Sequence, residues 1–116
     1  MQSYSAPLND MKFILKDFLS SEHSENILNN SEFNLDDFSF ILEESSKFCE
    51  DILLPLNQSG DKEGCTFDNG KVKTPKGFKE AYKQFVENGW QSAALDQKYG
   101  GQGLPYIFNV FFDEMI

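Results

Sequence analysis

The chain of 116 residues is long enough for one domain, and its hydrophobic content of 40% is enough to bury a core. Its formal net charge is −9, which disfavours binding to nucleic acid or to an anionic membrane surface. All ten cations are lysines, so the chain lacks the arginine side chain that most bidentate phosphate clamps use.

The sequence carries no targeting or membrane signal. No apolar run approaches the roughly 20 residues of a membrane span, and the start, MQSYSAPLND, lacks the regions of a signal peptide. Cys49 and Cys65 are too few and too widely spaced for a disulfide framework or a zinc site. We therefore expect reduced thiols, no metal site and a cytoplasmic protein.

Residues 6–19 predict a first helix. Pro7 suits its first turn, and an apolar stripe repeats at steps of three and four residues: Leu8, Met11, Leu15 and Phe18. So short a helix is marginal alone, so we expect it to dock on the rest of the chain. Residues 20–34 form a polar segment that contains the one histidine, His23, which has no partner at a catalytic or metal-binding spacing.

A second, longer helix is predicted from Leu35. Asn34 can cap its N-terminus, and apolar residues trace one face for five turns. Glu43 and Lys47 are spaced as a favourable i,i+4 ion pair on the opposite face. We expect Pro55 to end this helix.

Residues 56–74 are predicted to connect the second and third helices. The spacing of Gly64 and Gly70 fails the requirements of a phosphate loop, and a calcium loop starting at Asp61 lacks the required glycine and glutamate. Asn69-Gly70 between short β-prone pairs predicts a two-residue hairpin turn near residues 66–73.

A third helix is predicted to follow, with Thr74 as its N-cap, Pro75 at its first position and Asn88-Gly89 at its end. Its apolar stripe runs from Phe78 to Val86. We expect Trp90, directly after it, to be a structural anchor rather than a surface that stacks a ligand.

The run Gly100-Gly101-Gln102-Gly103-Leu104-Pro105 excludes a helix interior, because each glycine would cost about 1 kcal/mol and the proline about 3 kcal/mol there. It predicts a tight turn with positive φ angles, in which the main chain comes close to other atoms. The segment from Pro105 onward is apolar almost all round, which predicts a final helix that is buried on most sides. We expect an all-α fold with at most one short β-hairpin.

Two stretches, TPKGFKEAYKQFVENGW and YGGQGLPY, resemble the N-terminal helical domain of the flavin-dependent acyl-CoA dehydrogenases. The opening YSAPLNDMKFIL and the linker GDKEGC are similar to a long bacterial branch that carries an extra N-terminal segment. The resemblance covers essentially the whole chain in order. It divides the chain into an extension helix with a polar linker, residues 1–34, and a helical domain, residues 35–116, which is expected to be incomplete at its C-terminus.

The resemblance implies a three-part enzyme in which FAD lies between a middle β domain and a C-terminal helical bundle. A glutamate of the C-terminal part removes the α-proton of an acyl-CoA thioester while hydride leaves the β-carbon for the flavin. It implies an electron-transfer flavoprotein or a similar acceptor, and a homo-oligomer. None of these catalytic elements can be placed on this chain, so we expect it to be inactive alone and not to bind FAD by itself.

In this family the loop and the following helix help to wall the acyl-chain cavity. Carried over residue by residue, this predicts that seven residues lie near the substrate: Tyr99, Gly100, Gly101, Leu104, Phe108, Phe111 and Phe112. The same aromatic residues are also what a plain core would use. The acidic pair Asp113 and Glu114 is expected to be solvated or capping and not to be the catalytic base.

Two functions remain open from the sequence. The first is a part of an acyl-CoA dehydrogenase, and the second is a stand-alone helical module that docks on a partner protein without catalysis. The gene sequence after Ile116 distinguishes them, because the first requires several hundred further residues.

Overall fold

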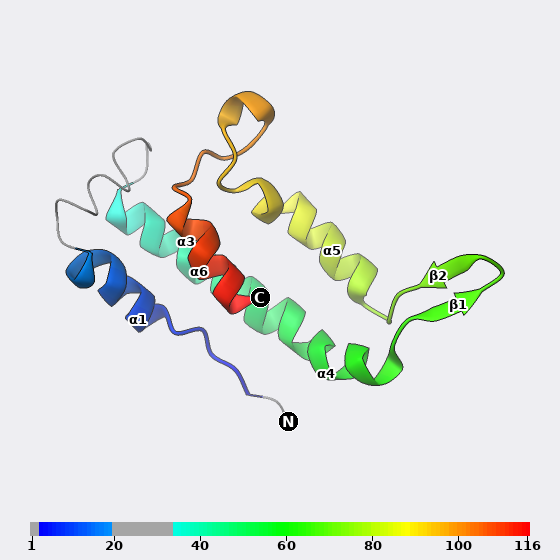
Figure 1. Cartoon of the computed structure of the whole chain (residues 1–116). Coiled ribbons are helices and arrows are strands. Elements are labelled where there is room, and N and C mark those ends of the chain that lie inside the picture. Colours follow the sequence, from blue (N-terminus) through cyan, green and yellow to red (C-terminus); the bar gives the residue numbers. More distant parts are fainter. Residues whose placement is uncertain (1–2, 20–33) are drawn as a thin grey trace.

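The computed structural model describes residues 3–19 and 34–116, which form helices and one small hairpin (Figure 1). The all-α prediction is therefore confirmed. A long helical rod is made of α3 (Leu35–Phe48), the π-helical turn η2 (Cys49–Leu53) and α4 (Leu54–Glu63). The polar segment predicted before Asn34, including His23, lies outside the described residues.

The first helix is shorter than predicted and changes its winding. It consists of α1 (Leu8–Phe13) and the π-helical turn η1 (Ile14–Phe18). Met11 and Leu15 are buried as the stripe predicted, but Phe18 is 73% exposed. The wider π turn holds more residues than an α turn, so it rotates Phe18 away from the stripe.

This first segment docks along α3. The backbone N–H of Ala6 donates to Glu50 Oε1 at 2.7 Å, and Lys12 forms an ion pair with Glu43. The predicted pair of Glu43 with Lys47 is therefore wrong, because Lys47 instead pairs with Glu44 one turn away. The hydrogen bond and charge of Lys12 lower the pKa of Glu43.

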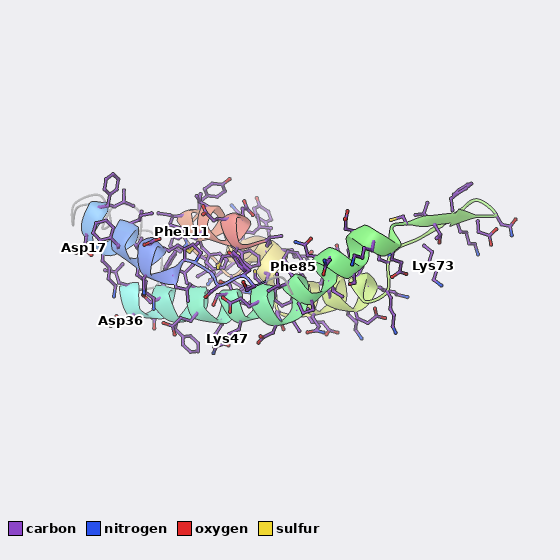
Figure 2. All side chains as sticks on the ribbon, turned by 90° about the horizontal axis from the view of Figure 1, so that it is seen from below. Asp17, Asp36, Lys47, Lys73, Phe85 and Phe111 are labelled. Carbon is purple, nitrogen blue, oxygen red and sulfur yellow. The ribbon has the colours of Figure 1, made fainter. Side chains whose placement is uncertain are left out.

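Helix α3 begins where the sequence predicts. The side chain of Asn34 accepts hydrogen bonds from the N–H groups of Asp36 at 3.0 Å and Asp37 at 2.9 Å, which confirms the cap. One face buries Phe38, Leu42 and Phe48. In Figure 2, Asp36 and Lys47 lie on the outer side of this helix, away from the layer that holds Phe111.

The prediction that Pro55 ends the second helix is wrong. The helical rod continues to Glu63, with Pro55 in the first turn of α4. The π-helical turn η2 comes directly before it, and the N–H of Leu54 bonds to the carbonyl of Cys49. In a regular α-helix the proline ring would clash with the carbonyl four residues earlier, and that carbonyl would lose its N–H donor. The wider π turn changes which N–H groups the carbonyls before Pro55 bind, so the helix can continue through the proline.

The predicted hairpin is confirmed. Strands β1 (Thr66–Asp68) and β2 (Lys71–Lys73) pair antiparallel, and Asn69 and Gly70 have φ angles of 48° and 77°. Two positive φ angles in a row are the geometry of a type I′ turn. The hairpin projects beyond the helices, as Figure 2 shows near Lys73.

Helix α5 (Phe78–Glu87) begins later than predicted, so Thr74 and Pro75 are not its N-cap and first residue. A turn comes first, in which the N–H of Phe78 donates to Pro75 O at 3.3 Å. Gly77 then has a φ of 90°, and a Cβ there would lie 2.6 Å from Leu56 Cδ2. The close approach of α4 at Leu56 thus decides where α5 starts. The predicted end at Asn88-Gly89 is confirmed, since Gly89 has a φ of 76°.

The glycine-rich stretch is a compact loop held by its own main chain. It contains the 3₁₀ turns η3 (Trp90–Ser92) and η4 (Gln97–Tyr99). The N–H groups of Gly103 and Leu104 donate to the carbonyls of Leu95 and Ala93, both at 2.9 Å. The predicted positive φ angles are present at Gly100, 85°, and Gly103, 71°.

The last helix, α6 (Ile107–Met115), lies on α3 (Figure 1). Phe108, Phe111, Phe112 and Met115 are buried. Val110 is 57% exposed, so one side of this apolar helix stays uncovered by the described residues. Within those residues no helix is both long and apolar enough to cross a bilayer.

The loop provides a stability test. A Cβ at Gly101 would lie 2.1 Å from the carbonyl oxygen of Leu95, which is backbone and cannot swing aside. We expect Gly101→Ala to lower the free energy of unfolding by about 3 kcal/mol, as overpacking does. At Gly100 the space is open, so Gly100→Ala should cost only the positive-φ strain, about 1 kcal/mol. Urea unfolding of both variants measures this, and equal losses would contradict it.

Candidate functional site

An apolar trough of about 720 Å³ lies between α4 and α5. We call it the trough, and the side chains that define it come from η2, α4, α5 and the end of α6: Leu53, Leu56, Phe78, Ala81, Tyr82 and Ile116. Tyr4 of the first segment also lines it. The trough is therefore built by segments from both ends of the chain.

The trough exists because α5 folds back beside α4 without closing against it. The two helices touch at one end, where a Cβ on Gly60 would lie 2.5 Å from the ring of Phe78. Nearer the body of the protein they separate, and the rings of Tyr82 and Phe85 stack at 6.3 Å between centroids on one wall. A glycine at position 60 thus sets how close the helices come at the far end.

A few polar groups border the apolar lining. Burial, and next the neighbouring Cys49, Glu114 and Glu50, raise the pKa of Tyr4. Burial, followed by the charge of Glu50, raises the pKa of the Cys49 thiol to about 11. Both groups stay protonated at neutral pH, so this edge of the trough supplies neutral hydrogen-bonding groups and no nucleophile.

The seven residues predicted to lie near a substrate do not gather around one cavity. Leu104, Phe108, Phe111 and Phe112 are buried in the core, with exposed fractions of 0 to 6%. Tyr99 is 77% exposed, Gly100 is exposed and Gly101 is half-buried, all on the compact loop. None of the seven lines the trough.

Two of the buried members, Phe108 and Phe112, form an aromatic cluster with Trp90, which packs as the predicted anchor. Phe112 lies at its centre, with ring centroids 5.5 Å from Trp90, 5.6 Å from Phe108 and 6.1 Å from Phe85. The indole Nε1 of Trp90 is buried without a hydrogen-bond partner among the described residues.

Sequence reasoning missed the trough. The sequence predicts an apolar stripe from Phe78 to Val86, but it does not predict a hollow beside that stripe. Leu56 and Asn57 were assigned to a loop because Pro55 was expected to end the helix, so a second helical wall was not foreseen. The apolar residues on either side of Pro55, at 53, 54 and 56, were the available signal.

The chain offers little to a phosphate-bearing cofactor. The trough is lined mainly by apolar side chains together with the acidic Glu114, and burying a diphosphate there without cations would be costly. Lys71 and Lys73 lie on the exposed hairpin. Among residues 3–19 and 34–116 no group of three or more histidine, cysteine or acidic side chains is placed to hold a metal ion.

The chain is similar to a known enzyme over nearly its whole length. It is 38% identical over 114 residues to the 3-methylmercaptopropionyl-CoA dehydrogenase of Ruegeria pomeroyi. The match takes in 98% of this chain but only 19% of the relative. No family model matches the chain. The predicted resemblance to an acyl-CoA dehydrogenase is thus confirmed, and the chain spans about a fifth of this relative's length.

The two cysteines allow a test of the burial beside the trough. Cys49 is buried and Cys65 is exposed, and both are free. With a pKa of about 11, about one Cys49 thiol in a thousand is ionised at pH 8. We expect Cys49 in a Cys65→Ser variant to react with a thiol reagent far more slowly than Cys65 in a Cys49→Ser variant. Its rate should rise about tenfold per pH unit up to about pH 11, because only the thiolate reacts. Equal rates for the two thiols at pH 8 would contradict the assignment.

Proposed function

We propose that this chain is the N-terminal helical part of an FAD-dependent acyl-CoA dehydrogenase, an oxidoreductase that introduces a double bond between the α and β carbons of an acyl-CoA thioester. The observation that carries the proposal is the 38% identity to a dehydrogenase over 98% of the chain. The mostly helical fold with one short hairpin is consistent with the helical domain that the resemblance implies.

The substrate proposed is 3-(methylthio)propanoyl-CoA. Within the bacterial branch with the N-terminal extension, the sequence pattern points to the dehydrogenases of this thioester. The name of the Ruegeria pomeroyi relative denotes the same compound. Acyl-chain preference depends on the depth of a cavity that the remainder of the enzyme completes. The proposed substrate is therefore inferred from the sequence similarity and not from the trough.

The role proposed for this chain is to supply packing surface and part of the wall of the acyl-chain cavity. In the proposal Tyr99, Gly100 and Gly101 face the substrate from the compact loop, and Leu104, Phe108, Phe111 and Phe112 support that wall from behind. The burial of the last four fits a supporting role. The exposure of Tyr99 leaves it free to meet another part of the enzyme.

The chemistry is assigned to other parts of the enzyme. FAD, when bound there, accepts the hydride, and the base that removes the α-proton also lies outside residues 1–116. The lack of arginine and the apolar trough support this division. The proposal includes an electron-transfer flavoprotein or similar acceptor, a homo-oligomer and a cytoplasmic location, with residues 1–34 as the extension and 35–116 as the helical domain.

The first test compares the chain with the longer polypeptide that its reading frame encodes. We expect residues 1–116 to bind no flavin and to reduce no electron acceptor with any acyl-CoA. The longer protein should purify yellow, and 3-(methylthio)propanoyl-CoA should bleach its flavin absorbance faster than straight-chain thioesters do. Turnover by residues 1–116 alone would contradict the proposal. A stop codon directly after Ile116 would favour a stand-alone interaction module instead.

A second test addresses the cavity wall in the longer protein. Tyr99 and Tyr106 are similarly exposed, at 77% and 75%, but only Tyr99 belongs to the proposed wall. We expect Tyr99→Ala to lower kcat/KM about fivefold, which corresponds to about 1 kcal/mol of lost contact. Tyr106→Ala should leave kcat/KM unchanged, and neither variant should change the unfolding midpoint of residues 1–116. A loss of the same size in both variants would contradict the assignment of Tyr99.

A further inference from the structure

The described residues leave the apolar trough open on one side. Tyr82 is 64% exposed, Ile116 is 63% exposed and Phe78 is 39% exposed. Several large apolar side chains open to water at one place mark a site that another segment covers. The question is which segment lies there.

The relative orientation of α5 and α6 shows in which direction α6 runs with respect to the trough. The rings of Phe85 and Phe112 are stacked, with centroids 6.1 Å apart and an interplanar angle of 9°. Three residues further along α6, Met115 lines the trough together with Ala81, which lies four residues back along α5. The two helices therefore run antiparallel, and α6 advances toward the beginning of α5.

Helix α6 is still helical at Met115, and its last residues form one end of the trough. Figure 1 shows this end directed along the rod toward the space beside α4 and α5. From Phe85 back to Phe78 is seven residues, or about 10 Å at 1.5 Å per residue. A continuation of α6 by about two to three turns would therefore run the length of the trough.

We propose that the trough is the seat of the polypeptide that continues α6 beyond Ile116, as a helix whose apolar face lies on Leu56, Phe78 and Tyr82. This rests on the proposed function, in which the chain continues into the remainder of a dehydrogenase. The matched segment is only 19% of the relative's length, so the continuation has ample sequence to come from. Being covalently attached to the wall it occupies, this segment has a high effective concentration at the trough.

The spacing of residues along α6 also predicts which side chains of the continuing helix are apolar and which are polar. The stripe of α6 that faces α5 contains Phe112 and Met115, and its next members are three or four and seven residues beyond Met115. The first of these should face Phe78 and be apolar. The edge beside Tyr4 and Glu114 is polar, so the helix should turn polar side chains toward it.

The experiment compares residues 1–116 with the same chain extended by its next twelve codons. In each length Tyr82→Ser is compared with Phe40→Ser, its matched control on the outer part of α3. The two aromatic side chains are equally open to water, 64% and 62% exposed, but only Tyr82 lines the trough. Thermal unfolding and binding of an apolar fluorescent dye are measured for all six proteins.

We expect the extension to raise the unfolding midpoint and to reduce dye binding, because it covers the trough. Tyr82→Ser should lower the midpoint by about 4 °C or more beyond its effect in the short chain, since about 1 kcal/mol of newly buried contact is lost. Phe40→Ser should have the same small effect in both lengths.

Unchanged dye binding on extension, or an equal effect of Tyr82→Ser in both lengths, overturns the proposal. A dimer of residues 1–116 in analytical ultracentrifugation, dissolved by Tyr82→Ser and unaffected by extension, would assign the trough to a second copy instead. These outcomes leave the proposed function standing if the longer protein oxidises an acyl-CoA. A reading frame that stops after Ile116 would defeat both proposals together.

Discussion

The structure depends on one aromatic cluster that joins three helices. Phe112 from α6 meets Phe85 from α5, while Phe48 from α3 contacts both Phe85 and Trp90 at 6.2 and 6.4 Å between centroids. Each such pair adds about 0.5–1.5 kcal/mol beyond the burial of its surface. Without this cluster, α5 would touch the rod only near Gly60 and Gly77, and the glycine-rich loop would have no base to fold on.

The cluster lies at one end of α5, and this explains the open shape of the molecule. Helix α5 is anchored to the body through Phe85 and Trp90, and to α4 through Phe78, but Tyr82 between these anchors is 64% exposed. The molecule is accordingly flat, with extents of 56 × 37 × 16 Å. Its radius of gyration of 16.8 Å compares with about 13 Å for a compact domain of this length. A layer that is barely two helices thick cannot cover both faces of its own apolar residues.

The sequence predicted features that depend on neighbouring residues and missed features that depend on distant ones. The cap at Asn34, the Asn69-Gly70 turn and the glycines with positive φ angles in the loop are local features, and all are present. The same local rules predict that Pro55 ends the second helix and that Pro75 is the first residue of the third, and both predictions are wrong. The turn η2 ahead of Pro55 and the contact of Leu56 with Gly77 belong to the packing of α4 against α5, which no window of neighbouring residues contains.

In the candidate site, too, local features could be predicted from the sequence and features that depend on tertiary packing could not. The apolar character of residues 104–112 was predictable from composition, but a sequence cannot tell a cavity wall from a core, since both need the same side chains. In this structure Phe108 and Phe112 serve as core, and a core position is compatible with supporting a wall only one layer away. In the proposed function, the wall would have to hold its shape when substrate enters, and a close-packed aromatic layer behind it would provide that rigidity. The aromatic cluster and the glycine-rich loop that it supports are therefore best understood as one unit, in which the buried rings fix the position of the few side chains that face outward.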